Sequence, residues 1–279
     1  MILIADSGST STNWVLVEHG AITQSLFTPG INPFYQIPKE IADTIAPLVK
    51  DLKSIDNIDS VYFYGAGCIS DKIEQVKQAI AQSFTHSQIY VESDLLAAAR
   101  ALLQHNAGIA CILGTGSNSC FYDGKNIINN ISPLGFILGD EGSGAVLGKK
   151  FIADCLKNQL PPELKNKFLT TFGLTANNII DRVYRKPFPN RYLAQFTPFF
   201  VEHITEPTVY KLIFDSFTDF FVRNVMQYPD FEKYPVSFVG SVAYYLKNIL
   251  EAVAIELDIT LGEIRQSPIE GLVTFHSTL

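Results

Sequence analysis

The chain contains two segments with one pattern, an apolar strand that ends in a turn of Gly, Ser and Thr and is followed by a second strand. The first is ILIADSGSTSTNWVLV at residues 2–17, and the second is IACILGTGSNSCFY at 109–122. When Gly8 is aligned with Gly116, the turns DSGSTS and GTGSNS match at an offset of 108 residues. A repeat of this kind indicates a duplicated α/β domain, and duplicated domains commonly bind a ligand between the halves.

Hydrophobic periodicity predicts the elements of each half. In residues 12–18, Trp14 and Leu16 lie on one side of a strand, and Val15 and Val17 lie on the other. The first half is predicted to contain strands at 2–5, 12–18, 21–27, 61–67 and 87–93, and helices at 39–53, 70–84 and from 94. The second half is predicted to contain three strands from 108, helices over 139–160 and 161–235, a strand at 235–240, a helix at 241–254, and a last strand and helix within 259–276.

Composition favours small molecules as partners. The net charge of −7 and the pI near 5.2 argue against a surface that neutralises nucleic-acid phosphates or binds anionic lipid. No apolar run approaches the roughly 20 residues of a membrane span, and no leader pattern is expected. The four cysteines lack a C-x-x-C pair, so we expect buried, reduced thiols and a cytoplasmic protein: Cys68, Cys111, Cys120 and Cys155.

Both Gly/Ser turns have the character of phosphate-binding loops. Glycine lets a backbone approach an anion closely and direct N–H groups at it. Asp6 ends the first strand just before its turn, where a carboxylate can hold Mg²⁺ beside the phosphates of a nucleotide. The structural alternatives are a tight hairpin for each turn and a turn-capping role for Asp6.

Two further acidic positions are candidates for chemistry. Asp94 follows a predicted strand and opens an Ala-rich helix. It is either a helix-capping residue or a base that takes a proton from an attacking hydroxyl. Asp140 and Glu141 lie between glycines in GDEGSG, where they are either solvated loop acids or acids that bind hydroxyls or a metal.

Other phosphate and hydrolase motifs are not found in the sequence. GAVLGKK at 144–150 has the wrong glycine spacing for a Walker loop and is predicted to be helical. There is no G-x-G-x-x-G of the dinucleotide-binding type. The five histidines show no metal spacing, and there is no G-x-S-x-G of a hydrolase.

An ordered set of motifs carries a resemblance to a known family. The set is DSGSTST, ESDLLAAARALL, ILGTGSNS, GFILGDEGSGAVLG and FVGSVAYYL. It resembles the N-acetylglucosamine kinases and BadF/BadG-type ATPases of the actin, sugar kinase and Hsp70 superfamily, over most of the chain and least at 155–235. The resemblance implies two actin-like (ribonuclease H-like) domains with a cleft between them. The first would span 1–107 plus a C-terminal helix at about 267–279, and the second 108–266 with a helical insertion at about 155–235.

The resemblance also implies roles for single residues. Asp6 would lie near Mg²⁺, and Asp94 would be the catalytic base and contact the sugar. The residues implied for ATP are Gly8, Ser9 and Thr10 in the first loop, Gly114, Thr115, Gly116 and Ser117 in the second, and Gly240 and Ser241 in the adenosine motif. The residues implied for the sugar are Asn32, Gly135, Asp140 and Glu141.

The implied function is an ATP- and Mg²⁺-dependent kinase that phosphorylates an amino sugar or related hexose, N-acetylglucosamine at its 6-hydroxyl being the first choice. The chain departs from the family at Ser11 and Asn13, at Leu134, and at Asn32-Pro33-Phe34, where the family has Asn-His-Trp. The alternatives are a BadF-type ATPase that activates a partner enzyme and a sugar sensor without catalysis. The expected partners are the sugar and ATP, with no nucleic acid or membrane, and we expect a homodimer.

Overall fold

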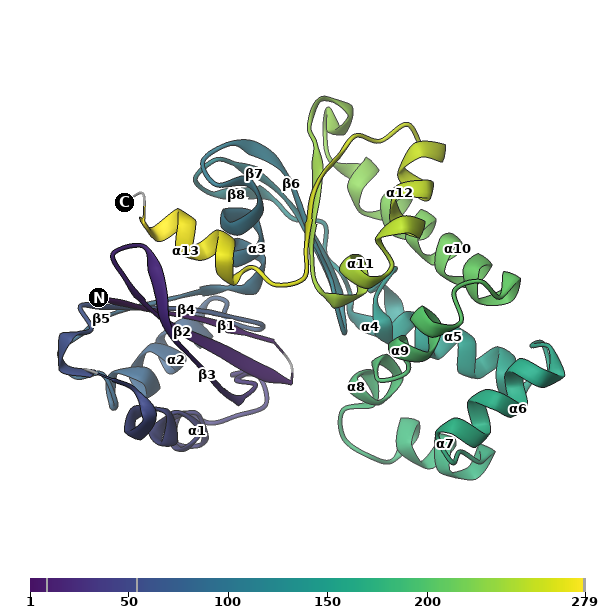
Figure 1. Ribbon diagram of the computed structural model, residues 1–279, viewed down its shortest axis with the longest axis horizontal. Coiled ribbons are helices and arrows are strands. Elements are labelled where there is room, and N and C mark those ends of the chain that lie inside the picture. The colour runs from purple at the N-terminus through teal and green to yellow at the C-terminus, as the bar shows by residue number, and fades with distance from the viewer. Residues whose placement is uncertain (9, 54, 278–279) are drawn as a thin grey trace. The chain divides into compact units, whose positions relative to one another are not determined.

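The computed structural model describes residues 1–8, 10–53 and 55–277 of the chain. It divides into two compact units, each of which is treated by itself below. The first unit comprises Met1–Ala110, Tyr122–Ile128 and Ser267–Leu279, and the second comprises Cys111–Phe121 and Asn129–Gln266. One five-stranded sheet lies within the first unit, and the strands of the second five-stranded sheet are divided between the two units. Helices flank both sheets (Figure 1), so the predicted α/β class is confirmed.

The sheet of the first unit has the strand order β3-β2-β1-β4-β5. Strand β1 pairs antiparallel with β2 and parallel with β4, which pairs parallel with β5. The strands are β1 Ile2–Ser7, β2 Ser11–Glu18, β3 Ala21–Pro29, β4 Ser60–Gly65 and β5 Gln88–Ser93. The helices are α1 Pro38–Asp51, α2 Asp71–Ala81, α3 Asp94–Leu103 and α13 Ile269–Ser277, with a 3₁₀ turn at Ile55–Asn57.

Two apolar cores cover the two faces of this sheet. Trp14 and Leu16 pack into one core with residues of α1 and α2, such as Ile45. Val15 and Val17 pack into the other with residues of α3 and α13. The alternation predicted for residues 12–18 is therefore confirmed, because side chains on a strand point alternately to opposite faces.

The second sheet repeats the strand order of the first. Its order is β10-β9-β6-β7-β8, which reads β8-β7-β6-β9-β10 from the other edge and so corresponds strand for strand to β3-β2-β1-β4-β5. The strands are β6 Ala107–Leu113, β7 Ser117–Asp123, β8 Ile127–Asn129, β9 Val236–Val239 and β10 Leu261–Arg265. The repeat inferred from the two turns therefore extends to the whole sheet topology.

The helices of the second unit follow the sequence prediction closely. They are α4 Gly135–Leu138, α5 Gly144–Leu156, α6 Pro162–Thr171, α7 Ala176–Tyr184, α8 Pro189–Ala194, α9 Thr197–Glu202, α10 Pro207–Arg223, α11 Ser241–Tyr245 and α12 Lys247–Glu256, with 3₁₀ turns at Val225–Gln227 and Phe231–Lys233. The segment GAVLGKK lies in α5, and 161–235 is helical as predicted.

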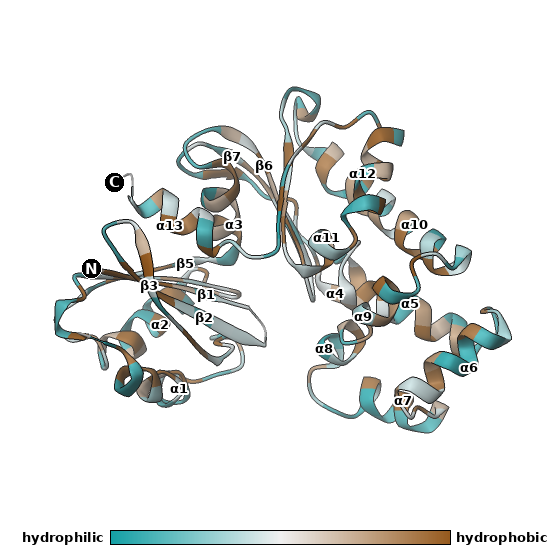
Figure 2. Ribbon diagram, viewed as in Figure 1, coloured by the Kyte–Doolittle hydropathy of each residue, from teal (hydrophilic) through white to brown (hydrophobic). Residues whose placement is uncertain are grey.

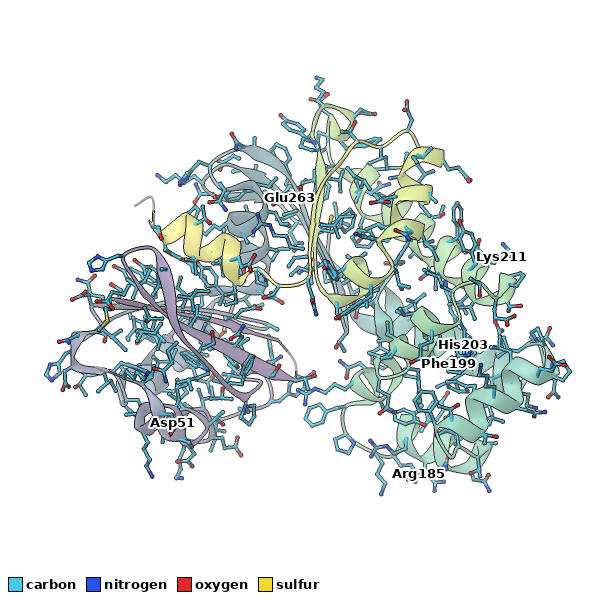
Figure 3. The ribbon with its side chains drawn as sticks, in the orientation of Figure 1. Asp51, Arg185, Phe199, His203, Lys211 and Glu263 are labelled. Atoms are coloured by element: carbon cyan, nitrogen blue, oxygen red, sulfur yellow. The ribbon has the colours of Figure 1, made fainter. Side chains whose placement is uncertain are left out.

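Phenylalanine side chains form much of the core of the helical region. Phe151 packs edge-on against Phe168, and Phe168 against Phe196, with ring centroids 4.9 and 5.1 Å apart. Phe199 stacks on His203 at 4.0 Å (Figure 3). Figure 2 shows apolar residues along the strands and on one side of many helices. None of the described helices is long and apolar enough to cross a membrane, and all four cysteine side chains are buried.

Candidate functional site

Two carboxylates of the first unit lie at one edge of its sheet. Strands β1, β4 and β5 are parallel, and Ser7, Gly65 and Ser93 form one row across their carboxyl ends. Asp6 immediately precedes this row, and Asp94 immediately follows it. Asp94 is held as the first residue of α3, because Ser93 caps the helix by accepting a hydrogen bond from Leu96 N at 3.2 Å.

The pKa values of both carboxylates are raised, and the charge of Asp94 contributes to the shift at Asp6. Burial, and then the charge of Asp94, raise the pKa of Asp6 to about 7. Burial also raises the pKa of Asp94, although its Oδ1 accepts a hydrogen bond from Leu95 N at 2.9 Å that partly opposes the shift. Two close carboxylates with raised pKa values favour a bound proton or a cation. This pair is therefore a candidate in the first unit for proton transfer or for binding a cation.

The surroundings of Asp6 fit a magnesium ion. Asn13 lies opposite Asp6 in the β1–β2 pair, so their side chains share one face of the sheet. The Oδ1 atom of Asn13 is buried and has no hydrogen-bond partner among the described residues. Mg²⁺ bound beside a nucleotide keeps several water molecules and needs only one or two carboxylates. A hydrated cation at Asp6 would supply donors for the unpaired amide oxygen.

The turn after β1 is exposed and braced from below. Gly8 and Thr10 are exposed, whereas Ser9 lies outside the described residues. Gly8 N donates to Ser11 O at 3.0 Å. The buried hydroxyl of Ser7 lies 2.7 Å from that of Thr12 and accepts a hydrogen bond from Ile31 N. These contacts fix the base of the turn.

Asn32 lies against the loop that follows β4. Its Oδ1 accepts a hydrogen bond from Phe34 N at 3.0 Å. A Cβ atom at Gly67 would lie 2.7 Å from Asn32 Oδ1, and Gly67 has a φ of +81°, so only glycine fits there. Ala66 N donates to Ser7 O, which ties this loop to the end of β1. Asn32 and Asp6 therefore border the same edge of the sheet.

The second unit contains a pocket of ≈ 550 Å³. Its lining comes from the turn between β6 and β7, from α8 and α9, and from α11. The lining residues are Gly114, Thr115, Ala194, Gln195, Thr197, Pro198, Val201, Glu202, Ser241, Val242 and Tyr245. Sequence segments more than 120 residues apart thus meet around one cavity.

Close backbone contacts hold the β6–β7 turn against α5. Gly144 N donates to Gly114 O at 2.9 Å, and Ala145 N donates to Thr115 O at 3.1 Å. On the other side, Gly240 has a φ of +125°, and a Cβ there would clash with the carbonyl group of Leu113. The turn and the start of α11 can therefore approach each other only with glycine at 240.

Asp140 lies directly behind the β6–β7 turn. Its Oδ1 accepts a long hydrogen bond from Ser117 N at 3.4 Å, and its Oδ2 would lie 3.2 Å from a Cβ at Gly116. Burial raises the pKa of Asp140 to about 6, opposed by the Ser117 hydrogen bond. Asp140 is thus placed to influence charge at the turn.

Glu141 is engaged elsewhere. Its carboxylate lies 3.1 Å from Arg223 Nη1 and accepts a hydrogen bond from Asn224 Nδ2 at 3.4 Å. Glu141 is buried, and these partners at the end of α10 fix the GDEGSG loop from behind. Gly135, with a φ of +74°, begins α4, and a Cβ added there would meet no described atom within 4 Å beyond its chain neighbours.

The structure therefore collects the predicted positions into two groups, one in each unit. Asp6, Asn32 and Asp94 border the edge of the first sheet. Gly114, Thr115 and Ser241 line the pocket, and Gly116, Ser117, Gly240 and Asp140 adjoin its walls. Gly135 and Glu141 are not among the residues that line the pocket.

The sequence motifs did not identify one wall of the pocket. It is made by α8 and α9 and includes Gln195, Thr197 and Glu202. These residues lie in a Phe-rich segment whose strongest signal is core packing, which hides pocket-lining residues. The signal in the sequence was that polar residues, Gln195 and Glu202, flank the group Phe196, Phe199 and Phe200, whose side chains are buried.

No family model matches the chain, and no curated protein matches it. A solved structure of a candidate N-acetylglucosamine kinase from Porphyromonas gingivalis is 48% identical, covers 100% of this chain and 99% of its own, and superposes with a TM-score of 0.97.

More distant structures share the fold. A candidate N-acetylglucosamine kinase from Chromobacterium violaceum is 16% identical, with 99% of each chain covered and a TM-score of 0.71. A ROK family glucokinase from Streptomyces griseus, solved with glucose and AMPPNP, is 16% identical, with 98% of this chain and 97% of its own covered and a TM-score of 0.58.

Proposed function

Because this chain belongs to the family of the P. gingivalis protein, among the sugar kinases of actin-like fold, we propose that it is an ATP-dependent sugar kinase. Its acceptor is an amino sugar or related hexose, with N-acetylglucosamine at the 6-hydroxyl as the first candidate. The observation that carries the proposal is the pair of buried carboxylates with raised pKa values, Asp6 and Asp94, at the carboxyl edge of the first sheet.

Asp94 is the catalytic base in this proposal. Burial raises its pKa, which makes it a better proton acceptor at neutral pH than an ordinary aspartate. Its rigid place at the start of α3 fixes the carboxylate relative to the sheet edge. It would orient the sugar hydroxyl and accept its proton as the oxygen attacks the γ-phosphate.

The pocket of the second unit is the proposed nucleotide site. Gly114, Thr115, Gly116 and Ser117 would direct backbone and hydroxyl donors at the β- and γ-phosphates. Gly240 and Ser241 would adjoin the adenosine. Gly8 and Thr10 of the first turn, with Ser9, which lies outside the described residues, would contact the transferred phosphate.

The remaining positions complete the proposed site. Mg²⁺, when bound at Asp6, would neutralise charge on the phosphates. Asn32, Gly135 and Asp140 would bind the sugar. Glu141, whose carboxylate is held by Arg223 and Asn224, would act on the sugar by positioning the loop that carries Asp140.

A screen of ADP release tests the proposed function. The purified protein is incubated with ATP and Mg²⁺ and with N-acetylglucosamine, glucosamine, N-acetylmannosamine, glucose or no sugar. Turnover that requires a sugar, and is fastest with N-acetylglucosamine, supports the proposal. Turnover without sugar would instead indicate an ATPase that activates a partner, and sugar binding without turnover would indicate a sensor.

The homodimer stays a prediction, which light scattering after gel filtration would test.

A further inference from the structure

Helices α7 and α8 of the second unit line another pocket, which has no part in the proposed phosphoryl transfer. Its volume is ≈ 360 Å³, and its lining residues are Arg182, Pro187, Phe188, Arg191, Tyr192 and Gln195. Two of these six residues are arginines. Gln195 also lines the larger pocket, so the two cavities share one side chain.

The charges around this pocket are unbalanced. Residues 181–191 contain four cations and one carboxylate, Asp181, although the net charge of the chain is −7. Two of these cations, Arg185 and Lys186, lie 4.0 and 3.8 Å from Asp181. Figure 3 labels Arg185 at the outer rim of the unit. Arg182 and Arg191 make no ion pair within the part of the chain that the structure describes. The cations that line the pocket are therefore the two that lack a carboxylate.

Both pocket arginines place their guanidinium groups over aromatic rings. The guanidinium carbon of Arg191 lies 4.2 Å from the ring centroid of Phe188, and that of Arg182 lies 5.2 Å from the centroid of Tyr192. A cation–π contact of this kind restrains a guanidinium group and leaves N–H groups that can donate to a ligand. Such N–H groups match the oxygens of a phosphate group. The rings also offer apolar surface to the carbon skeleton of a ligand.

Two local features of the pocket cost stability. Phe188 adopts a left-handed conformation, with φ 57° and ψ 51°, which is strained for a bulky residue. The Tyr192 hydroxyl is buried and has no hydrogen-bond partner among the described residues, which also carries a cost. Both features adjoin the two unpaired arginines, and strain of this kind is concentrated at binding sites.

We propose that this pocket is a second ligand site, separate from the nucleotide pocket, and that it binds a small phosphorylated molecule of the size of a sugar phosphate. Arg182 and Arg191 bind the phosphate, and Phe188 and Tyr192 contact the rest of the ligand. A shift of the exposed Arg182 side chain on binding would bring the ligand within reach of the Tyr192 hydroxyl.

Isothermal titration of the full chain tests the site without relying on turnover. The probes are glucose 6-phosphate, inorganic phosphate and glucose, each added in the presence of saturating ADP and N-acetylglucosamine, so that the sites of the proposed reaction are filled. We expect glucose 6-phosphate to bind, inorganic phosphate to bind more weakly, and glucose not to bind.

Substitutions locate the binding. Arg182→Gln and Arg191→Gln should each raise the Kd for glucose 6-phosphate about tenfold, as the loss of a charge-assisted hydrogen bond predicts. The matched control Arg185→Gln, in the same basic segment but outside the pocket, should change it less than about twofold. Tyr192→Phe should weaken binding without lowering the melting temperature, since it removes an unpaired buried hydroxyl.

Three results would overturn the proposal. One is the absence of binding when ADP and N-acetylglucosamine are saturating, because the phosphorylated probe then has no site of its own. Another is an equal loss of affinity in Arg185→Gln and Arg191→Gln, which would show only a diffuse basic surface. The third is unchanged affinity in both pocket variants, which would place the probe elsewhere. All variants should bind ADP within about twofold of the unsubstituted chain, which checks that the fold is intact.

Discussion

At the scale of single residues, Gly114 is a position where glycine is needed for the proposed ligand contact but not for the fold. It lines the larger pocket, its φ lies outside the left-handed region, and a Cβ there would have no heavy atom within 4 Å. The fold therefore does not require glycine at 114. Glycine at 114 is required only if a phosphate is to contact the backbone there.

Gly114→Ala should leave the melting temperature nearly unchanged and raise the Kd for ADP about tenfold, because the added methyl group occupies the space in which a phosphate approaches the amides. Differential scanning fluorimetry and titration calorimetry measure the two quantities. Normal ADP affinity in this variant would mean that the phosphates do not lie against the turn.

The identity of Asn13 is informative in the sequence, but its contacts are known only from the structure. The family resemblance marks it as a departure from a charged position. The pairing of Asn13 with Asp6 and its unpaired Oδ1 atom follow only from the register of β1 and β2. Register depends on the turn geometry and the packing of both faces, so the partner of Asn13 could not be identified from its own segment.

At the scale of secondary-structure elements, the contact of α5 with α8 positions the wall of the nucleotide pocket. Gly148 of α5 faces the backbone of Leu193 in α8, and a Cβ at Gly148 would lie 2.7 Å from Leu193 C. Gln195, which follows α8, lines the pocket. A bulkier residue at 148 must push α8 away.

Gly148→Ala should destabilise the protein by about 1–3 kcal/mol, the usual cost of overpacking, and weaken ADP binding, since the displaced α8 carries pocket residues. Urea unfolding and ADP titration measure these effects. For the stability measurement, Gly114→Ala is the matched control, because it adds the same methyl group where space is open. Equal stability of the two variants would contradict the packing described for α5 and α8.

Helix α13 is joined to the first sheet by a buried polar contact. Arg100 Nη1 donates to the Tyr64 hydroxyl at 2.8 Å, so that hydroxyl can donate to His276 Nε2 at 2.9 Å. Burial, and then the charge of Arg100, lower the pKa of His276 to about 4. The imidazole is therefore neutral in the folded protein at neutral pH.

A lowered histidine pKa makes stability depend on pH. The unfolded chain binds a proton at His276 below about pH 6.5, whereas the folded chain binds it only near pH 4. The contribution of His276 to the free energy of unfolding should thus be lost as the pH falls from about 6.5 to 4, by up to about 3 kcal/mol.

The comparison with His276→Gln isolates this effect, because carboxylates with raised pKa values, such as Asp140, change stability in the opposite direction over the same range. Urea unfolding at pH 7.5 and 5 should show a larger fall in stability for the unsubstituted chain than for the variant. An equal change in the free energy of unfolding between pH 7.5 and 5 in the two proteins would refute the buried, neutral state of His276.

Elements were more predictable than sites, for a physical reason. The alternation of Trp14 and Leu16 with Val15 and Val17 can be recognised within one short segment of the sequence. The same is true of the helical spacing of Ile41, Ile45 and Leu48 in α1. The pocket joins the turn at Gly114 to α9 and α11, and no local pattern encodes that contact. The α8–α9 wall was missed for this reason.

At the scale of the whole molecule, two units with the same sheet order have different chemical features. The first has carboxylates at its sheet edge, and the second has a pocket lined by a Gly/Thr turn. The repeat of the turns predicted the duplication, but identical topology leaves the side chains at each edge free to differ. Function must therefore be assigned to each copy from its own residues.

Hydrogen exchange with and without ADP should show this difference. Because the pocket lies wholly in the second unit, we expect ADP to slow amide exchange in 113–117, 194–202 and 240–246. The segment 38–51, which is α1 in the first unit, should change least. Mass spectrometry of peptides provides the measurement, and protection absent from 194–202 would contradict the assignment of the pocket to the nucleotide.

The central claim, that Asp94 is the base of a sugar kinase, is tested most directly by the sugar-dependent turnover of Asp94→Asn. Asp71→Asn is its matched control, because Asp71 is also the first residue of a helix that follows a serine. Both changes remove a charge that favours a helix N-terminus.

With ATP, Mg²⁺ and N-acetylglucosamine, we expect Asp94→Asn to lower kcat by at least about 100-fold, the usual contribution of a general base, while ADP and sugar still bind. Asp71→Asn should retain its rate. A near-normal kcat in Asp94→Asn would contradict the account.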